Sequence, residues 1–205
     1  MARRKDHPPE VLKVLIRQAA QKIISTKGLN ALTARNLAKA IGYTPGTIYN
    51  FYRDMDALVG EVNYNTLGEL EQACRERIEK LPHDFSRVRA LAYAYVDFSH
   101  AHTHAWETLF SGTRISTKSS RLPKPYQQRI FALFQLIEDV LRDCLGLLVA
   151  EAHRSARLLW ATLHGITVLT LDGRLRMVGI EEPHQIIDNL LEKYFTSHIT
   201  KEITS

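Results

Sequence analysis

Histidine is the residue type whose spacing first suggests chemistry in this 205-residue chain. The segment "SHAHTHAW" places His100 and His104 four residues apart, which on one helical face is the spacing of a metal-ligand pair. The segment lacks the His-Glu-x-x-His frame of zinc hydrolases, and a third ligand would have to come from afar, for instance from His153 or Glu107. A helical metal-binding or catalytic protein therefore stays open as the alternative interpretation, and we expect no metal.

Other catalytic patterns are absent from the sequence. The chain contains no glycine-rich phosphate loop, no nucleophile elbow and no paired carboxylates. Cys74 and Cys144 match no metal or redox spacing, which fits two free thiols in a reducing compartment. No apolar run approaches the length of a membrane span, and the charged N-terminus is not a secretory signal. We expect a cytoplasmic protein with no enzymatic activity, no cofactor and no membrane contact.

A second set of residues is suited to nucleic acid. Residues 32–52 read "LTARNLAKAIGYTPGTIYNFY", two short apolar-periodic runs separated by Gly42. Thr44 can cap the second run, and Pro45 can take the first helical position, where its missing N–H costs nothing. In a helix-turn-helix the second helix lies in the DNA major groove and presents its N-terminal residues to base edges. Small or polar residues open this run and continue on or near its exposed faces: Thr44, Pro45, Gly46, Thr47, Tyr49, Asn50 and Tyr52.

Charge supports this interpretation because it is confined to one end of the chain. Residues 1–55 carry ten Lys and Arg against three acids, a net charge of +7, whereas the whole chain carries +5. Residues 56–205 are therefore slightly acidic. A basic module on a near-neutral body is the pattern expected when only one part of a protein contacts a polyanion.

The elements that must position these residues are all helical. Nearly every segment has helical periodicity and none alternates as a strand, so the sequence predicts an all-α fold of about nine helices. A three-helix head over 1–55 is expected to bind DNA and is followed by a larger helical body over 56–205, to which the family resemblance given below assigns ligand binding and dimerisation. The expected helices are Pro8–Lys27, Ala34–Ile41, one after Thr44, a long one after Asp54, Phe85–His102, Ala105–Ser111, Lys124–Cys144, Glu151–Leu171 and Pro183–Ile199.

The motif "LTARNLAKAIGYTPGTIYNFYRDMDAL", after a helix ending "TKGLNA", resembles the DNA-binding domain of the TetR family of bacterial transcriptional repressors. The resemblance covers about residues 10–62. A further fragment, "LLWATLHGITVLTLDGRL", resembles the Trp-x-x-x-His-Gly segment of one type of TetR C-terminal domain. The resemblance implies a homodimer on a palindromic double-stranded DNA operator, released by a small-molecule inducer bound in the body.

The resemblance also implies roles for single residues. Arg35 and Thr47 match positions that reach bases, Tyr49 matches a phosphate contact, and Thr33 matches a backbone contact at the start of the second helix. Tyr43, Thr44, Pro45 and Gly46 match the groove-facing turn. Two positions depart from the pattern, because Phe51 and Met55 replace a histidine and a lysine that usually touch phosphate.

The last two long helices are the candidates for self-association. The helix over 151–171 is apolar nearly all round, so both of its sides must be covered, one by the chain's own core and the other by a second copy. A central helix in a monomeric bundle is the other interpretation. The expected interface residues are Ala161, Gly165, Val168, Ile187, Leu190, Leu191 and Tyr194.

Aromatic residues gather in the middle helices and could line an apolar cavity. A pocket is favoured because the family uses one, whereas the spacing alone is equally typical of a filled core. A constitutive DNA binder without a pocket therefore stays open. The expected pocket residues are Tyr64, Tyr93, Phe98, Trp106, Phe110, Phe131, Phe134, Trp160 and His164.

Overall fold

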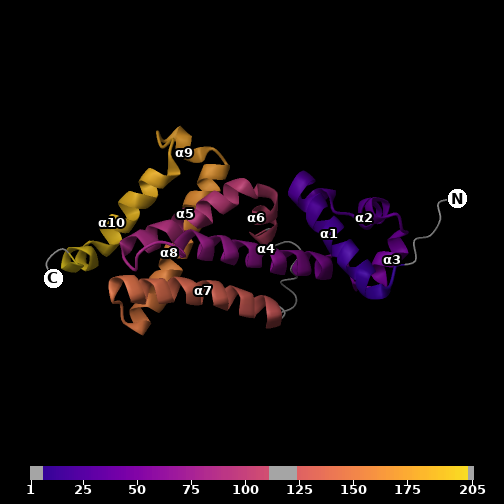
Figure 1. Cartoon of the computed structure of the whole chain (residues 1–205). Coiled ribbons are helices and arrows are strands. Elements are labelled where there is room, and N and C mark those ends of the chain that lie inside the picture. Colours follow the sequence, from indigo (N-terminus) through magenta and orange to yellow (C-terminus); the bar gives the residue numbers. More distant parts are fainter. Residues whose placement is uncertain (1–6, 111–123, 203–205) are drawn as a thin grey trace. The chain divides into compact units, whose positions relative to one another are not determined.

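The computed structural model describes residues 7–110 and 124–202, with side chains to residue 196, and every regular element in these ranges is a helix (Figure 1). The predicted all-α fold is confirmed, and the short helices η1 and α9 add to the expected set. The polar stretch 111–123 and the basic residues 3–5 lie outside the described residues. The elements are α1 Pro9–Lys27, η1 Leu29–Ala31, α2 Ala34–Ile41, α3 Pro45–Tyr49, α4 Met55–Ile78, α5 Phe85–Ala101, α6 Thr103–Phe110, α7 Lys124–Leu145, α8 Val149–Leu171, α9 Arg174–Met177 and α10 Pro183–Glu202.

These helices form two compact units. The first contains the described residues within Met1–Gly68 and His102–Gln127, and the second those within Glu69–Ala101 and Gln128–Ser205. Helix α4 therefore begins in the first unit and ends in the second. Helix α6 follows α5 in sequence but packs in the first unit, on α1 and η1. A functional division into 1–55 and 56–205 stays a prediction.

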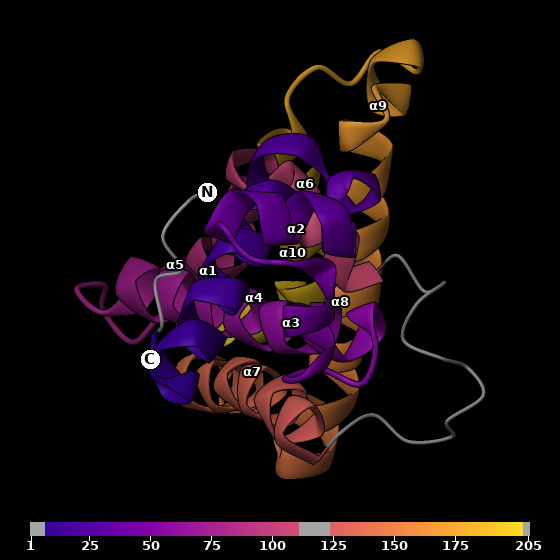
Figure 2. The ribbon, with the colours of Figure 1, turned by 90° about the vertical axis from the view of Figure 1, so that its right-hand side faces the viewer.

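The core of the first unit is built on one face of α1. Leu12, Ile16, Ala20 and Ile24 recur every four residues and are buried, which places them in one row along the helix. They join a single cluster with buried residues of α2, α3 and the start of α4. Gly28, with a φ of 75°, ends α1 as predicted. The face of the unit that carries α2 and α3 is turned toward the reader in Figure 2.

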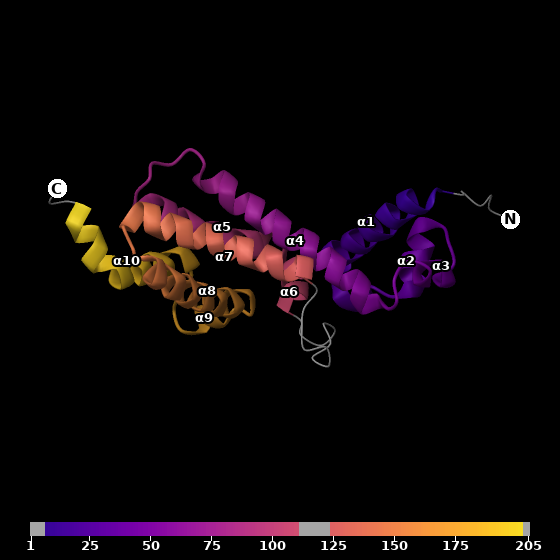
Figure 3. The same cartoon turned by 90° about the horizontal axis from the view of Figure 1, so that it is seen from below.

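Helix α8 and its neighbours form the second unit. Helix α5 contacts α8 and α10, and α10 buries Ile187, Leu191 and Phe195 completely. Ion pairs between Arg89 of α5 and Asp188 of α10, at 2.9 Å, lie beside this apolar contact. Helix α7 lies beside α4 (Figure 3), and Arg129 of α7 pairs with Glu71 of α4 at 3.1 Å. Within the described part of the chain, every helix is too short or too polar to span a bilayer.

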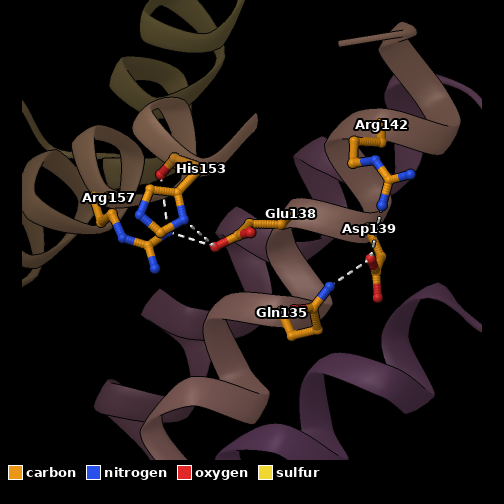
Figure 4. Close-up of polar contacts among 6 residues, drawn as sticks. All are labelled: Gln135, Glu138, Asp139, Arg142, His153 and Arg157. Atoms are coloured by element: carbon orange, nitrogen blue, oxygen red, sulfur yellow. Dashed lines mark hydrogen bonds and ion pairs between the residues drawn. The ribbon is translucent and has the colours of Figure 1, made fainter. Parts of the chain in front are cut away.

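Helices α7 and α8 are joined by a carboxylate. Glu138 of α7 is largely buried, and its carboxylate contacts two residues of α8 (Figure 4). It accepts a hydrogen bond from the Arg157 guanidinium, and it lies 3.2 Å from His153 Nδ1. The Arg157 guanidinium also lies 4.7 Å from the centre of the Phe134 ring. His153 is thus engaged with Glu138 rather than with the histidines near residue 100.

Candidate nucleic-acid interface

The turn between α2 and α3 has the geometry that the sequence predicts. Thr33 caps α2, since its hydroxyl accepts a hydrogen bond from Asn36 N at 3.1 Å. Gly42 ends α2 with a φ of 77°, a left-handed conformation that a side chain would strain. The Tyr43 N–H then donates to the Ala38 carbonyl at 2.9 Å, which directs the chain into α3. The buried side chains of Leu37, Ala38 and Ile48 pack between the two helices.

Burial of Ile48 fixes which side of α3 faces outward. Pro45 takes the first helical position after Thr44, as expected. The Thr44 hydroxyl does not cap the helix, however, but lies 3.2 Å from the Thr47 hydroxyl. The start of the helix therefore presents two hydroxyls, while the Thr47 N–H donates to the Thr44 carbonyl at 3.0 Å. Hydroxyl groups of this kind can bind phosphate or base edges.

The predicted DNA-contact residues fall into three groups by exposure. Seven residues are exposed and two, Tyr43 and Thr47, are half-buried; the exposed ones are Thr33, Arg35, Thr44, Pro45, Gly46, Tyr49 and Asn50. Tyr52 is the exception, with only 5% of its surface exposed. Nine of the ten residues therefore lie where a partner can reach them.

Tyr52 was predicted on the surface, but it lies in the core. Its ring is part of the first unit's core, and its hydroxyl donates a hydrogen bond to Glu61 Oε2 at 2.6 Å. Burial, together with this carboxylate, raises the pKa of the Tyr52 hydroxyl. The other oxygen of Glu61 accepts from Arg17 at 3.3 Å, so the network links α1, the end of α3 and α4.

Phe51 and Met55, which replace the family's phosphate-contacting residues, also pack against this core. Neither side chain can replace the lost phosphate contacts. Glu61 and Arg17 were not predicted as partners of Tyr52, since each has an ordinary place on an amphipathic helix. Only the packing of α1 against α4 brings them to Tyr52.

The turn also holds the start of the described chain. His7 Nδ1 lies 2.8 Å from the Tyr43 hydroxyl, and the rings are 6.1 Å apart between centroids. This contact was not foreseen, because it joins residues 36 positions apart.

The predicted pocket residues divide between the units. Tyr64, Trp106 and Phe110 lie in the first, where the rings of Trp106 and Phe110 are 4.8 Å apart. In the second unit, Trp160 lies 5.8 Å from Phe134 and 5.6 Å from His164 between ring centroids. These three rings therefore form one cluster.

Two further residues bear on this cluster. Tyr95 was not among the predicted pocket residues, yet its hydroxyl lies 3.0 Å from His164 Nδ1. Burial lowers the pKa of His164 below its ordinary value, which favours the neutral imidazole. Tyr93 instead packs against His184, with ring centroids 4.3 Å apart. Phe131 has 62% of its surface exposed, whereas Phe98 is buried. The described structure thus groups only part of the predicted set.

The prediction that His100 and His104 share a helical face is also wrong. His100 belongs to α5 and His104 to α6, since the chain turns at His102, so the two do not share a helical face. His104 Nδ1 lies 3.5 Å from Glu107. No group of three metal-ligating side chains occurs among the residues the structure describes.

An exposed apolar face runs along α8. Leu158, Ala161, Gly165 and Val168 follow one another at spacings of three and four residues, and none of them is buried. Tyr194 of α10 is exposed and Leu190 is half-buried. Ile187 and Leu191, also expected at a dimer interface, are completely buried in the chain's own core and cannot contact a second copy in this packing.

Several solved structures share this fold. A protein with unknown function from Rhodococcus sp. RHA1 is 21% identical with a TM-score of 0.75, over 96% of this chain and 99% of that one. The fatty acid degradation regulator FadR from Bacillus halodurans is 13% identical with a TM-score of 0.64, over 92% and 95%. A possible TetR family transcriptional regulator from Streptomyces coelicolor A3(2) is 20% identical with a TM-score of 0.56, over 76% and 69%. No curated protein matches the chain.

An all-α chain with an outward-facing second helix after a glycine turn defines a helix-turn-helix regulator. Residues 16–62 match the bacterial regulatory proteins of the tetR family, and residues 88–194 match the tetracyclin repressor-like C-terminal domain. The chain therefore belongs to the TetR family and is a transcriptional regulator with a DNA-binding helix-turn-helix domain and a C-terminal ligand-binding domain.

Proposed function

We propose that this regulator is a repressor that binds a palindromic operator as a homodimer in the cytoplasm and is released by a small-molecule inducer. The observation that carries the DNA-binding part is the outward face of α3. Burial of Ile48 turns Thr44, Gly46 and Asn50 outward, at a helix N-terminus in the basic quarter of the chain. Such a surface complements both phosphates and base edges.

Within this interface Arg35 is assigned to base recognition. It is exposed on the first turn of α2, and a bidentate contact from arginine to guanine is worth about 1–3 kcal/mol of discrimination. Thr47 and the turn residues Tyr43 to Gly46 are assigned to the groove. Tyr49, which is 52% exposed, is assigned to phosphate, as is the start of α2 at Thr33.

The dimer is assigned to the exposed apolar face of α8, with Tyr194 and Leu190 of α10 at its edge. Ala161 and Gly165 lack bulky side chains, so two copies of α8 can approach closely across a two-fold axis. A contiguous apolar face of this kind is rarely left in water. Members of this family are generally not enzymes, and no catalytic role is proposed for any residue.

Selection from random duplex DNA across a salt series tests the proposal. We expect enrichment of a palindrome bound with salt-dependent affinity. Arg35→Ala should lower affinity about 5- to 150-fold and relax specificity at one base pair. The control is Lys39→Ala, which removes the same charge one turn later on α2 and should weaken all sequences equally. Failure to enrich any sequence would contradict the proposal.

A further inference from the structure

A buried acceptor without a partner lies on α4. Asn63 is completely buried, and its amide Nδ2 donates to the Thr108 carbonyl of α6 at 3.2 Å. Its carbonyl oxygen Oδ1 is also buried, and no donor among the described residues reaches it. Buried polar groups are normally paired, so an unpaired one requires an explanation, such as a ligand that supplies the missing donor.

Two other buried polar groups on these helices, the hydroxyls of Thr66 and Thr108, donate elsewhere. Thr66 lies one turn after Asn63 on the same face of α4, and its hydroxyl donates to the Val62 carbonyl at 3.2 Å. The Thr108 hydroxyl donates to the His104 carbonyl at 2.7 Å. Each hydroxyl therefore donates within its own helix and supplies no proton to Asn63 Oδ1.

Most other buried side chains of α6 and of the adjoining part of α4 are apolar, although the indole N–H of Trp106 is itself a buried donor. Val62 and Leu67 of α4 are buried, as are Trp106 and Leu109 of α6. A carboxylate has no proton to donate to Asn63 Oδ1, and its burial would cost a large desolvation penalty. A neutral molecule with an N–H or O–H group would satisfy Asn63 Oδ1 and bury its apolar part against the same helices.

We propose that Asn63 is the polar anchor of the inducer site, and that the inducer is an uncharged, mainly apolar molecule that donates a hydrogen bond to Asn63 Oδ1. This inference rests on the proposed function, because it specifies the ligand of that regulator. Since Asn63 has no exposed surface, binding requires the side chains between α4 and α6 to part.

Matched probes test the donor requirement on the protein alone. Indole carries one N–H donor, and benzofuran has nearly the same shape without it. We expect calorimetry to show indole binding at least tenfold more tightly than benzofuran, and benzoate not binding. Equal affinities for indole and benzofuran would overturn the inference, and so would binding of neither; both results would assign Asn63 Oδ1 to an internal water.

A variant locates the effect. In Asn63→Leu the preference for indole should disappear, whereas Asn65→Leu, a half-buried asparagine on the same helix, should keep it. A retained preference in a folded Asn63→Leu variant would overturn the assignment. If that variant fails to fold, the wild-type comparison of the two probes still decides.

Operator binding separates this inference from the proposed function. An enriched palindrome with no donor preference would remove only the ligand assignment. If indole binds more tightly than benzofuran but the selection enriches no DNA sequence, the ligand site at Asn63 is supported and the repressor proposal is contradicted. The two measurements use the same full-length protein.

Discussion

Removal of one hydroxyl from Tyr52 should destabilise the DNA-binding unit without removing a DNA contact. In Tyr52→Phe, the ring stays in the core while Glu61 Oε2 loses its 2.6 Å donor. Hydrogen bonds to charged groups contribute about 1.5–3 kcal/mol to stability. Because 27% of the Glu61 side chain is exposed, water replaces part of that bond. We therefore expect a loss at the low end, about 1.5 kcal/mol.

Urea unfolding followed by fluorescence measures this loss as a lower midpoint with an unchanged slope. The same change at Tyr49 is the matched control, since Tyr49 is exposed and its hydroxyl is assigned to phosphate. Tyr49→Phe should change the free energy of unfolding by less than about 0.5 kcal/mol. It should nevertheless weaken DNA binding. The reverse pattern, a stable Tyr52→Phe with impaired DNA contact, would refute the placement of Tyr52 in the core.

Three further predictions concern caps, pH and assembly. Thr33→Ala and Asp54→Ala each remove an N-cap acceptor; Thr33 accepts from Asn36 N at 3.1 Å, and Asp54 accepts from Ala57 N at 2.8 Å. Each variant should lower the free energy of unfolding by about 1 kcal/mol, measured by a thermal melt, whereas Thr26→Ala should not. Because burial lowers the folded pKa of His164 below 6.5, the unfolded chain takes up this proton first as pH falls. Stability should therefore decline below about pH 6.5 more steeply than in His164→Gln, and parallel pH profiles would contradict this. Leu158→Glu on the exposed face of α8 should give monomers in sedimentation, whereas Lys80→Glu, at an exposed residue outside α8 and α10, should not; dimers in both would contradict the assigned interface.

The parts of the fold that could be predicted from sequence depend on neighbours in the chain. The Thr33 cap and the Gly42 turn are local, and both are observed where the residue types placed them. Tyr52 was misplaced because helical periodicity shows that a side chain leaves one face, but not whether a distant helix covers that face. The partner that covers it, Glu61, is specified only by tertiary packing.

The same limit applied in the body and at the histidines. An amphipathic α10 needs an apolar partner, but its pattern does not distinguish the chain's own core, where Ile187 and Leu191 lie, from a second copy. The expected helices Phe85–His102 and Ala105–Ser111 already separated His100 from the segment after His104, so the four-residue spacing alone could not place both histidines on one face. Asn63 Oδ1 could not be found from sequence at all, since an unpaired acceptor is recognised only by its surroundings.

The central claim, that two copies read DNA together through α3, is tested most directly by changing operator spacing. Half-sites one helical turn apart, roughly 10 base pairs, face the same side of the duplex. Anisotropy binding is compared between the selected operator and versions with about 5 or about 10 base pairs inserted between half-sites. The account predicts that the half-turn insertion lowers affinity to that of a single half-site. Equal affinity for the selected operator and the half-turn insertion would contradict it.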